Sequence, residues 1–304
     1  MRRSIPVSAA PALLVALLMV DSLHFVFARV LLHKIDPFIS AMYVIGIATV
    51  EVGVYGVATR QLSLEPLRRY WGMFLGIGFC VAVSTVLNYS AVRYIDPGTA
   101  SMLGKMSILF GLGFGILWLG DRLTRWQVVG AIVALAGMFT ITFQPGDYLR
   151  LGSLMVVLST FLYALHAALS KRWGGEMDLL NFFFYRLLLT TTFLLVIAVG
   201  AGALAPPPAG AWPWLLLVGT VDVVISRSLY YATLRRLDMS VFSIVLTLSP
   251  VAAILWSLAL FHTAPNGQQL LGGVGVLAGV FLVTAGPTLQ NLRGKAWPKR
   301  SSAT

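Results

Sequence analysis

Ten long apolar segments restrict the fold of this chain more than any other feature of its sequence. A helix needs roughly 20 mainly apolar residues to cross the hydrocarbon core of a bilayer. Segments of about this length lie near residues 10–31, 37–59, 70–92, 97–119, 124–143, 150–170, 180–202, 212–234, 239–261 and 266–287. The connectors between them are too short to hold a soluble domain. We therefore expect an all-α membrane protein with ten transmembrane helices.

The composition agrees with a lipid bilayer as the surroundings of the chain. Only 11% of the residues are charged, against roughly 25% in soluble domains, and a soluble fold of this kind would expose large apolar patches. The net charge of +11 is often a sign of a nucleic-acid partner. The basic residues lie at the ends of the apolar segments, however, and form no continuous face, so we predict no nucleic-acid partner.

The cysteine content and the N-terminal sequence further limit the kinds of site and segment that the chain can contain. Cys80 is the single cysteine and lies in an apolar segment, so neither an intrachain disulfide nor a metal site is expected, and no cofactor is predicted. The chain begins like a signal peptide, with two arginines before an apolar segment. Because that segment contains Asp21 and His24 and lacks a clear small-residue cleavage site, we interpret it as the first membrane helix.

Lysine and arginine are distributed very unevenly between alternate connectors. One side holds Arg2, Arg3, Arg60, Arg68, Arg69, Arg122, Arg125, Lys171, Arg172, Arg235, Arg236, Arg293, Lys295, Lys299 and Arg300. The other side holds Lys34, Arg93 and Arg150, with Arg29 near a helix end. The positive-inside rule then places both termini in the cytoplasm. An arginine- and alanine-rich composition suggests a multi-pass protein of a bacterial inner membrane.

The two halves of the chain align without a gap at one offset. An offset of 142 residues separates His24 from His166. The same offset relates Asp36 to Asp178, Tyr43 to Tyr185, Thr49 to Thr191, Ser84 to Ser226, Tyr89 to Tyr231, Arg93 to Arg235 and Asp96 to Asp238. Matches of polar residues at one offset are specific in so apolar a chain. We predict a first five-helix repeat over 1–146 and a second over 147–304, which includes a short basic tail.

Five spans in each half have a consequence for topology. An odd number makes the second half enter the membrane from the opposite side, which gives two inverted repeats. Inverted repeats are typical of secondary transporters that alternate access around a site near the midplane. Gene duplication also produces channels and some membrane enzymes, so the repeat alone does not decide between these classes.

The chain resembles the drug/metabolite transporter superfamily, in its EamA-type branch, over nearly its whole length. The residues that carry the resemblance are Asn88-Tyr89-Ser90-Ala91, Asp96-Pro97-Gly98-Thr99-Ala100-Ser101, Leu117-Trp118-Leu119-Gly120-Asp121-Arg122-Leu123-Thr124, Gln127-Val128-Val129-Gly130 and Leu135-Ala136-Gly137. The second copy has Leu248-Ser249-Pro250, Gln269-Leu270-Leu271-Gly272 and Leu277-Ala278-Gly279. The copies differ where Asp121 aligns with Thr263 and Pro250 with Ile108. The resemblance implies that spans 1, 3, 4, 6, 8 and 9 surround a central cavity.

Polar residues at helical spacing fall on those six spans, and they give the candidate site. The candidate substrate-binding residues are Lys105, Ser84, Asn88, Tyr89, Ser101, Tyr163, His166, Tyr230, Ser243, Thr247 and Arg227. Lys105 lies too deep in its segment to reach the interface easily, and its ammonium would bind a carboxylate or phosphate. The alternative is a structural ion pair of Lys105 with Asp21 or Asp222.

Three residues are candidates for proton coupling. Asp21 and His24 lie one helical turn apart, and a carboxylate next to a histidine suits a proton relay; a hydrogen-bonded packing pair is the alternative. Asp222 is the third candidate. Asp222 and Arg227 are five residues apart, so they do not share a face of an ideal helix, and Arg227 is expected to pair across helices. For Glu51 and Arg186 we favour a structural role.

Small residues in the fifth and tenth segments suggest close helix packing. They are Gly130, Ala134 and Gly137, and Gly272, Gly275 and Gly279. This packing is expected either within one chain or between two, so the protein is predicted to be a monomer or a homodimer.

These features together favour a secondary transporter, an exporter of a small polar metabolite such as an amino acid. The alternative within transport is an exchanger of phosphorylated substrates or lipid precursors, which needs several cations in the cavity. An intramembrane enzyme is disfavoured, because the sequence contains no nucleophilic serine motif, metal spacing or phosphate-binding glycine loop. The expected partners are a small-molecule substrate, the bilayer and a coupling proton.

Overall fold

The computed structural model describes residues 10–23, 27, 31, 34–91, 94, 103–143, 151–261 and 265–296. Elements of regular structure within these ranges are all helical. The first half contains α1 (Ala10–Ser22), α3 (Pro37–Ala58), the short α4 (Glu65–Arg69), α5 (Trp71–Ala91), α7 (Met106–Leu117) and α8 (Arg125–Thr142). The second half contains α9 (Leu151–Trp173), α10 (Leu179–Gly200), α11 (Trp212–Val218), η4 (Gly219–Ile225), α12 (Ser226–Leu234), α13 (Met239–Val245), η5 (Leu246–Leu248), α14 (Ser249–Phe261) and α15 (Gly267–Ala296).

Helix starts repeat between the two halves as the sequence offset predicts. The Asp36 side chain caps α3 by accepting from the amides of Phe38 and Ile39. Asp178 does the same for α10 with Leu180 and its neighbour. An aspartate at this position satisfies amides that have no partner within the helix. The aligned aspartates therefore fix equivalent helix boundaries, from 37 to 58 and from 179 to 200.

The equivalent helices α8 and α15 pack against each other in antiparallel fashion. A Cβ atom built on Gly130 would lie 2.6 Å from the carbonyl oxygen of Gly279, and one on Gly137 would lie 2.6 Å from that of Gly272. The residue numbers rise on one helix as they fall on the other, so the helices run in opposite directions. The glycine stripes thus pack within one chain, which is one of the two arrangements expected from the sequence.

The helices α3 and α10 make equivalent hydrogen bonds, each to the other half of the chain. The Tyr43 hydroxyl donates to the carbonyl oxygen of Ala205 at 3.3 Å. Its aligned partner Tyr185 donates to the carbonyl oxygen of Ser63, the residue aligned with Ala205, at 2.8 Å. Each half therefore makes the same contact with the other.

Thr49 and Thr191 mark where the symmetry axis passes. Their hydroxyl oxygens are 2.8 Å apart although the residues are 142 positions apart in the chain. A residue that contacts its own equivalent lies on the pseudo-twofold axis. Because the equivalent helices α8 and α15 are antiparallel, this axis runs across those helices rather than along them, as an inverted repeat requires.

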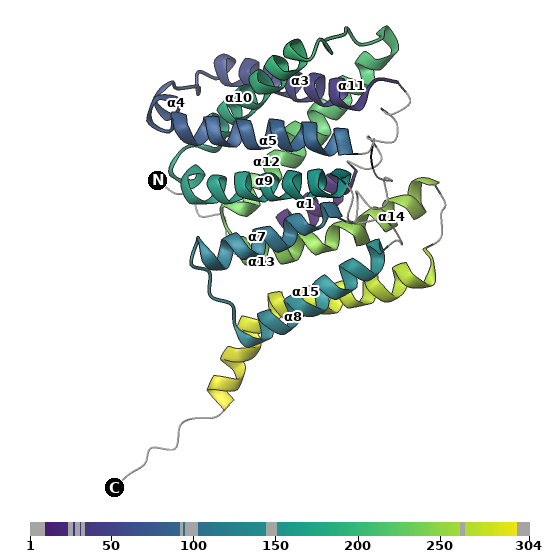
Figure 1. The fold of residues 1–304 in the computed structure, drawn as a ribbon. Helices are drawn as coiled ribbons and strands as arrows, with labels where there is room; N and C mark the ends of the chain where they lie inside the picture. The colour runs from purple at the N-terminus through teal and green to yellow at the C-terminus, as the bar shows by residue number, and fades with distance from the viewer. Residues whose placement is uncertain are drawn as a thin grey trace.

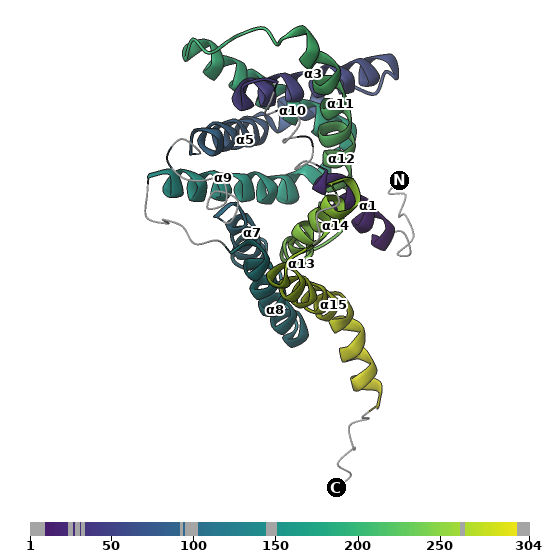
Figure 2. The same ribbon diagram turned by 90° about the vertical axis from the view of Figure 1, so that its right-hand side faces the viewer.

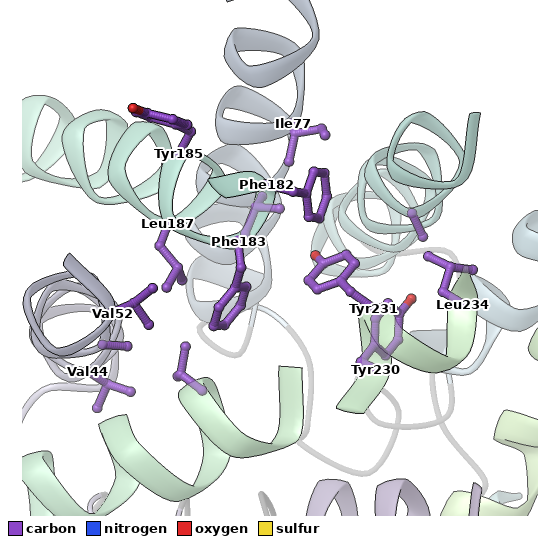
Figure 3. Packing of buried hydrophobic residues seen from close by; sticks show 14 of the residues in the cluster. Val44, Val52, Ile77, Phe182, Phe183, Tyr185, Leu187, Tyr230, Tyr231 and Leu234 are labelled. Atoms are coloured by element: carbon purple, nitrogen blue, oxygen red, sulfur yellow. The ribbon is translucent and has the colours of Figure 1, made fainter. Parts of the chain in front are cut away.

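The helices stack in a regular order, which both ribbon views show (Figures 1 and 2). α3 and α10 lie at one end of the stack, α5 and α9 follow, α7 and α13 come next, and α8 and α15 form the other end. Figure 3 shows the largest apolar cluster, in which Phe182 and Phe183 of α10 face Tyr231 of α12. Their ring centroids are 5.0 and 6.1 Å from that of Tyr231.

Eight helical stretches of the described chain are long and apolar enough to cross a membrane, judged by length and composition. Two shorter apolar helices, Leu13–Ser22 and Met106–Leu117, fall in the first and fourth predicted segments, which extend beyond the described residues. The ends of most other segments agree with the prediction to within about three residues. The last helix is longer than expected, since α15 continues to Ala296.

The eighth and ninth predicted segments are interrupted helices. The eighth changes from α11 to the π-helix η4 and then to α12. The ninth changes from α13 to the 3₁₀ turn η5 and then to α14, in which Pro250 is the second residue. Proline fits the first turn of a helix, where its missing N–H needs no partner. Both segments therefore stay helical along their length, with a change of hydrogen-bond pattern inside each.

Candidate functional site

An ion pair between α1 and α12 connects the two halves of the molecule. Nη1 of Arg227 lies 3.0 Å from Oδ1 of Asp21, and the two side chains are only 17% and 19% exposed. The Ser226 hydroxyl donates to the same carboxylate oxygen at 3.3 Å. A charge inside a membrane helix costs roughly 2.5–3.5 kcal/mol on insertion scales. The pairing offsets part of this cost for both residues at once, and it agrees with the expectation that Arg227 pairs across helices.

Two tyrosines surround the Arg227 guanidinium. Nη1 of Arg227 donates to the Tyr163 hydroxyl of α9 at 3.2 Å. The guanidinium carbon lies 5.8 Å from the ring centre of Tyr230, within range of a cation–π contact. Arg227 is therefore held by a carboxylate, a hydroxyl and an aromatic face from three helices.

The polar network continues from Tyr163 to α10. The rings of Tyr163 and His166 are 4.5 Å apart, and Nε2 of His166 lies 3.1 Å from the Tyr231 hydroxyl. The Arg186 guanidinium lies 5.3 Å from the Tyr231 ring centre. Arg186, for which we favour a structural role, thus lies next to Tyr231, which contacts the candidate residue His166.

Lys105 and Asp222 belong to the same electrostatic environment. Lys105 immediately precedes α7 and interacts electrostatically with Asp21. Asp222, which is buried, interacts electrostatically with Arg227. Asp21 and Asp222 thus share an electrostatic environment with Lys105 and Arg227. For Lys105, both substrate binding and a structural ion pair stay predictions.

The π-helix η4 contains Asp222 and ends two residues before Arg227. On an α-helix, residues five apart lie about 140° from one another around the axis, because each residue turns by about 100°. η4 spans Gly219–Ile225 and has the wider turn of i→i+5 bonds, which brings residues five apart much closer to one face. Arg227 lies beyond η4, in α12, so the prediction that Asp222 and Arg227 do not share a face stays a prediction. π-helical turns frequently occur at functional sites.

A small cavity adjoins the ion pair. Its walls come from α7, α9, α12, α13 and η5, and they are Ser107, Ile108, Tyr163, Ala164, Ala167, Tyr230, Met239, Phe242, Ser243 and Leu246. Tyr163, Tyr230 and Ser243 are candidate residues from the sequence, and the first two also contact Arg227. The cavity is thus bounded by aromatic and apolar side chains, with a charged pair beyond the tyrosines.

Other predicted residues lie elsewhere or have other partners. The Ser84 hydroxyl is 3.0 Å from that of Ser159, which joins α5 to α9. Thr247 is fully buried and donates to the carbonyl oxygen of Ile244, whereas Asn88 is exposed. His24, Ser101 and the side chain of Tyr89 lie outside the described residues.

Four polar residues near the site are absent from the list of candidate site residues: Ser107, Arg186, Ser226 and Tyr231. The internal repeat contained a signal for two of them. Ser226 and Tyr231 align with the candidates Ser84 and Tyr89. Each candidate and its equivalent at the offset of 142 residues are therefore to be considered together.

The comparison with known families decides the class of this protein. Residues 9–143 and 150–285 each match the EamA-like transporter family. The chain belongs to this family. EamA-like transporters are membrane proteins that move small molecules, so the resemblance noted in the sequence is confirmed, and the two separate matches agree with the two-repeat architecture.

Known relatives of this EamA-like chain are transporters as well. It is 24% identical to an uncharacterised transporter of Synechocystis sp. over 66% of this chain, and the match spans 61% of that relative's length. It is 26% identical to a probable terminal-alkyne amino-acid exporter of Streptantibioticus cattleyicolor, over 86% of this chain and 85% of the relative. A solved crystal structure with 19% identity has the same fold, with a TM-score of 0.77 over 91% of this chain and 97% of that one.

Proposed function

We propose that this EamA-like protein is a secondary transporter that exports a small polar metabolite, such as an amino acid, by alternating access. The observation that carries the proposal is the Asp21–Arg227 ion pair, because it joins a helix of one repeat to a helix of the other beside a cavity. A buried charged pair at such a junction is a functional hypothesis by default. The amino-acid exporter among the relatives supports this choice of substrate.

In this proposal the chain has ten spans, with both termini in the cytoplasm of a bacterial inner membrane. The eight long apolar helices and the two short ones support ten, and the basic connectors support the orientation. Inverted halves that pack across a pseudo-twofold axis suit a transporter whose site opens to each side in turn.

The site residues have distinct proposed roles. Lys105 and Arg227 are the two cations near Asp21, and either would bind an anionic group of the substrate. Tyr163, Tyr230 and Ser243 shape the cavity. Asp21 is the proposed proton-coupling group together with His24 and Asp222, because protonation of its carboxylate would weaken its hold on Arg227 and Lys105.

The second candidate function is exchange of phosphorylated substrates or lipid precursors. It requires several cations in one place, and the approach of both Lys105 and Arg227 to Asp21 favours it. The two carboxylates near these cations argue against it, because they compensate the charge that a phosphate would need.

Counterflow in proteoliposomes tests the proposal. Purified protein is reconstituted, the vesicles are loaded with an unlabelled amino acid or sugar phosphate, and entry of the labelled compound is followed. We expect saturable counterflow for amino acids and its loss in Lys105→Ala or Arg227→Ala. Counterflow of sugar phosphates alone would select the exchanger, and the absence of saturable flux for every compound would contradict transport of either class.

A further inference from the structure

The helices α1 and α12 form a second shared feature about two turns away from their ion pair. Asp21 contacts Ser226 and Arg227, and seven residues from Asp21 and from Ser226 along the two helices, Leu14 and Thr233 line one crevice. Seven residues of an α-helix span about 10 Å. Because the numbers fall on α1 as they rise on α12, the helices are antiparallel. The crevice therefore lies where α1 begins and α12 ends.

The crevice is narrow and has one charged and one hydroxyl side chain. It is lined by Leu13, Leu14, Thr233, Arg236 and Leu237. Arg236 is exposed, whereas Thr233 is only 3% exposed. The free space inside holds about one water-sized atom. The crevice can therefore admit a single oxygen atom of a ligand, and the rest of that ligand must lie outside it.

The Thr233 hydroxyl is a polar group that lacks a partner at this place. Its Oγ1 atom is buried and has no hydrogen-bond partner among the residues that the structure describes. Burial of an unpaired hydroxyl is unfavourable, because the group has lost its hydrogen bonds to water. An oxygen atom of a ligand in the crevice would accept from this hydroxyl and remove the penalty.

Arg236 provides a positive charge at the mouth of the crevice. Within the described part of the chain, its guanidinium makes no ion pair or hydrogen bond. The neighbouring Arg235 is already engaged, because its Nη1 atom donates to the carbonyl oxygen of Met177 and its guanidinium lies 5.2 Å from the ring centre of Phe182. Of these two arginines, Arg236 is thus the one that is available to an anionic ligand.

The helix ends around the crevice also favour an anion. The first turn of α1 carries a positive partial charge, and the last turn of α12 a negative one. The Nζ atom of Lys171 compensates the latter, since it donates to the carbonyl oxygens of Leu234 and Leu237 at 2.9 and 2.6 Å. Asp238, the acid nearest to Arg236 in the sequence, interacts electrostatically with Lys171. The carbonyl groups and the carboxylate near Arg236 therefore have a cation of their own.

The position at the helix ends indicates which anion is present there. The ends of membrane-spanning helices lie at the level of the lipid headgroups, and the proposed orientation assigns these two ends to the cytoplasmic leaflet. Basic residues at that surface attract anionic lipids. A guanidinium forms charge-assisted hydrogen bonds with phosphate oxygens, and leucine side chains suit the apolar part of a lipid.

We propose that the crevice between α1 and α12 binds the headgroup of an anionic phospholipid. Arg236 binds the phosphate, one phosphate oxygen accepts from the Thr233 hydroxyl, and the acyl chains lie against Leu13 and Leu14. The site is separate from the proposed transport site. A bound lipid would hold together the two helices that carry the Asp21–Arg227 ion pair.

A lipid series on the purified wild-type protein tests the inference. The probes are phosphatidylglycerol, phosphatidylcholine and diacylglycerol with the same acyl chains, and inorganic phosphate, each added to delipidated protein in a neutral detergent. Binding is measured from the rise in melting temperature, since a ligand of the folded state stabilises it, and native mass spectrometry counts the retained lipid. We expect phosphatidylglycerol to bind about fivefold or more tightly than phosphatidylcholine. Diacylglycerol and inorganic phosphate should give no shift.

Two variants examine the two polar groups of the crevice. Arg236→Gln should weaken binding of phosphatidylglycerol about fivefold. Thr233→Val should weaken it about threefold, while the lipid-free protein keeps or gains melting temperature because the lost hydroxyl has no partner. Arg68→Gln is the matched control, because Arg68 is also an exposed arginine on the same basic side, at the end of α4, but does not line the crevice. It should keep the wild-type affinity.

Each contrary outcome overturns a different part of the inference. If diacylglycerol stabilises the protein as much as phosphatidylglycerol does, the crevice binds apolar chains only. Equal binding of phosphatidylcholine would contradict the preference for an anionic lipid, and equal binding of inorganic phosphate would make a free anion the ligand. If Arg68→Gln weakens binding as much as Arg236→Gln, the whole basic surface attracts the lipid and the site is wrong. Should Thr233→Val not fold, the wild-type series and the exposed Arg236 decide, and counterflow tests transport independently.

Discussion

Asp21 and Arg227 each carry a charge that a membrane helix does not readily tolerate alone. Arg227 pairs with Asp21 and donates to Tyr163, and Asp21 also accepts from Ser226, so both charged side chains have polar partners on another helix. The sequence identified both residues as candidates, because a charged residue interrupts an apolar segment. It did not show which charges meet, since that depends on how each helix is rotated about its axis.

Arg227→Met is the most direct substitution at this scale. It removes the guanidinium and leaves the Asp21 carboxylate with weaker compensation, so we expect unfolding free energy to fall by about 3 kcal/mol and counterflow to be lost. The double variant Asp21→Asn, Arg227→Met should recover part of the stability without recovering counterflow. Thermal unfolding in detergent measures the first quantity. If Arg227→Met is as stable as the wild type, the ion pair does not stabilise the fold.

Tyr163→Phe separates ligand binding from stability. The change removes the hydroxyl that accepts from Arg227 and keeps the ring, so we expect a stability loss of about 0.5–1.5 kcal/mol together with weaker substrate binding. Tyr185→Phe is the control, because it loses a hydrogen bond to Ser63 far from the cavity. It should show a similar loss of stability with unchanged affinity. Equal affinity in both variants would contradict a role for Tyr163 in the site.

At the scale of elements, the length of the apolar segments predicted the extent of most helices well. It did not predict the changes of helix type inside the eighth and ninth segments. Asp36 and Asp178 predicted equivalent helix starts because a cap depends only on nearby residues. The π-helix Gly219–Ile225 has no comparable local signal. It contains Asp222 and ends just before the helix that carries Arg227. In the ninth segment, the 3₁₀ turn η5 lies about one turn before Pro250.

Neighbouring glycines of α15 give a matched test of helix packing. A Cβ on Gly272 would lie 2.6 Å from the backbone carbonyl oxygen of Gly137, whereas one on Gly273 would have no neighbour within 4 Å. We expect Gly272→Ala to lower unfolding free energy by about 1–3 kcal/mol through overpacking. Gly273→Ala should be neutral or stabilise by up to about 1 kcal/mol through helix propensity. Equal effects in detergent unfolding would mean that α8 and α15 do not approach this closely.

At the scale of the whole molecule, the internal repeat was the most informative sequence feature. One offset of 142 residues identified equivalent positions far apart in the chain, and the structure shows that one such pair, Thr49 and Thr191, is in contact. The contacts between non-equivalent residues were not predictable in this way. Asp121 is an example: its carboxylate accepts from the Ser240 amide at the start of α13, at 2.7 Å, and so joins the two halves.

The proposed orientation makes a prediction for the whole chain. Both termini should lie in the cytoplasm, because the basic connectors and the basic tail remain on that side. Fusion of a fluorescent protein that matures only in the cytoplasm to the C-terminus should give fluorescence, whereas alkaline phosphatase at the same place should be inactive. The opposite pair of results would place the C-terminus outside and contradict an even number of spans with a cytoplasmic N-terminus.

Alternating access to the cavity is the central claim, and thiol labelling tests it most directly. Cys80 is the single cysteine, so Cys80→Ser gives a cysteine-free protein, into which Ser107→Cys places one thiol in the cavity wall. A membrane-impermeant maleimide is applied to right-side-out and to inside-out vesicles, after counterflow has shown that the variant is active. The account predicts labelling from each side and slower labelling in the presence of substrate. Labelling from one side only, with and without substrate, would contradict it.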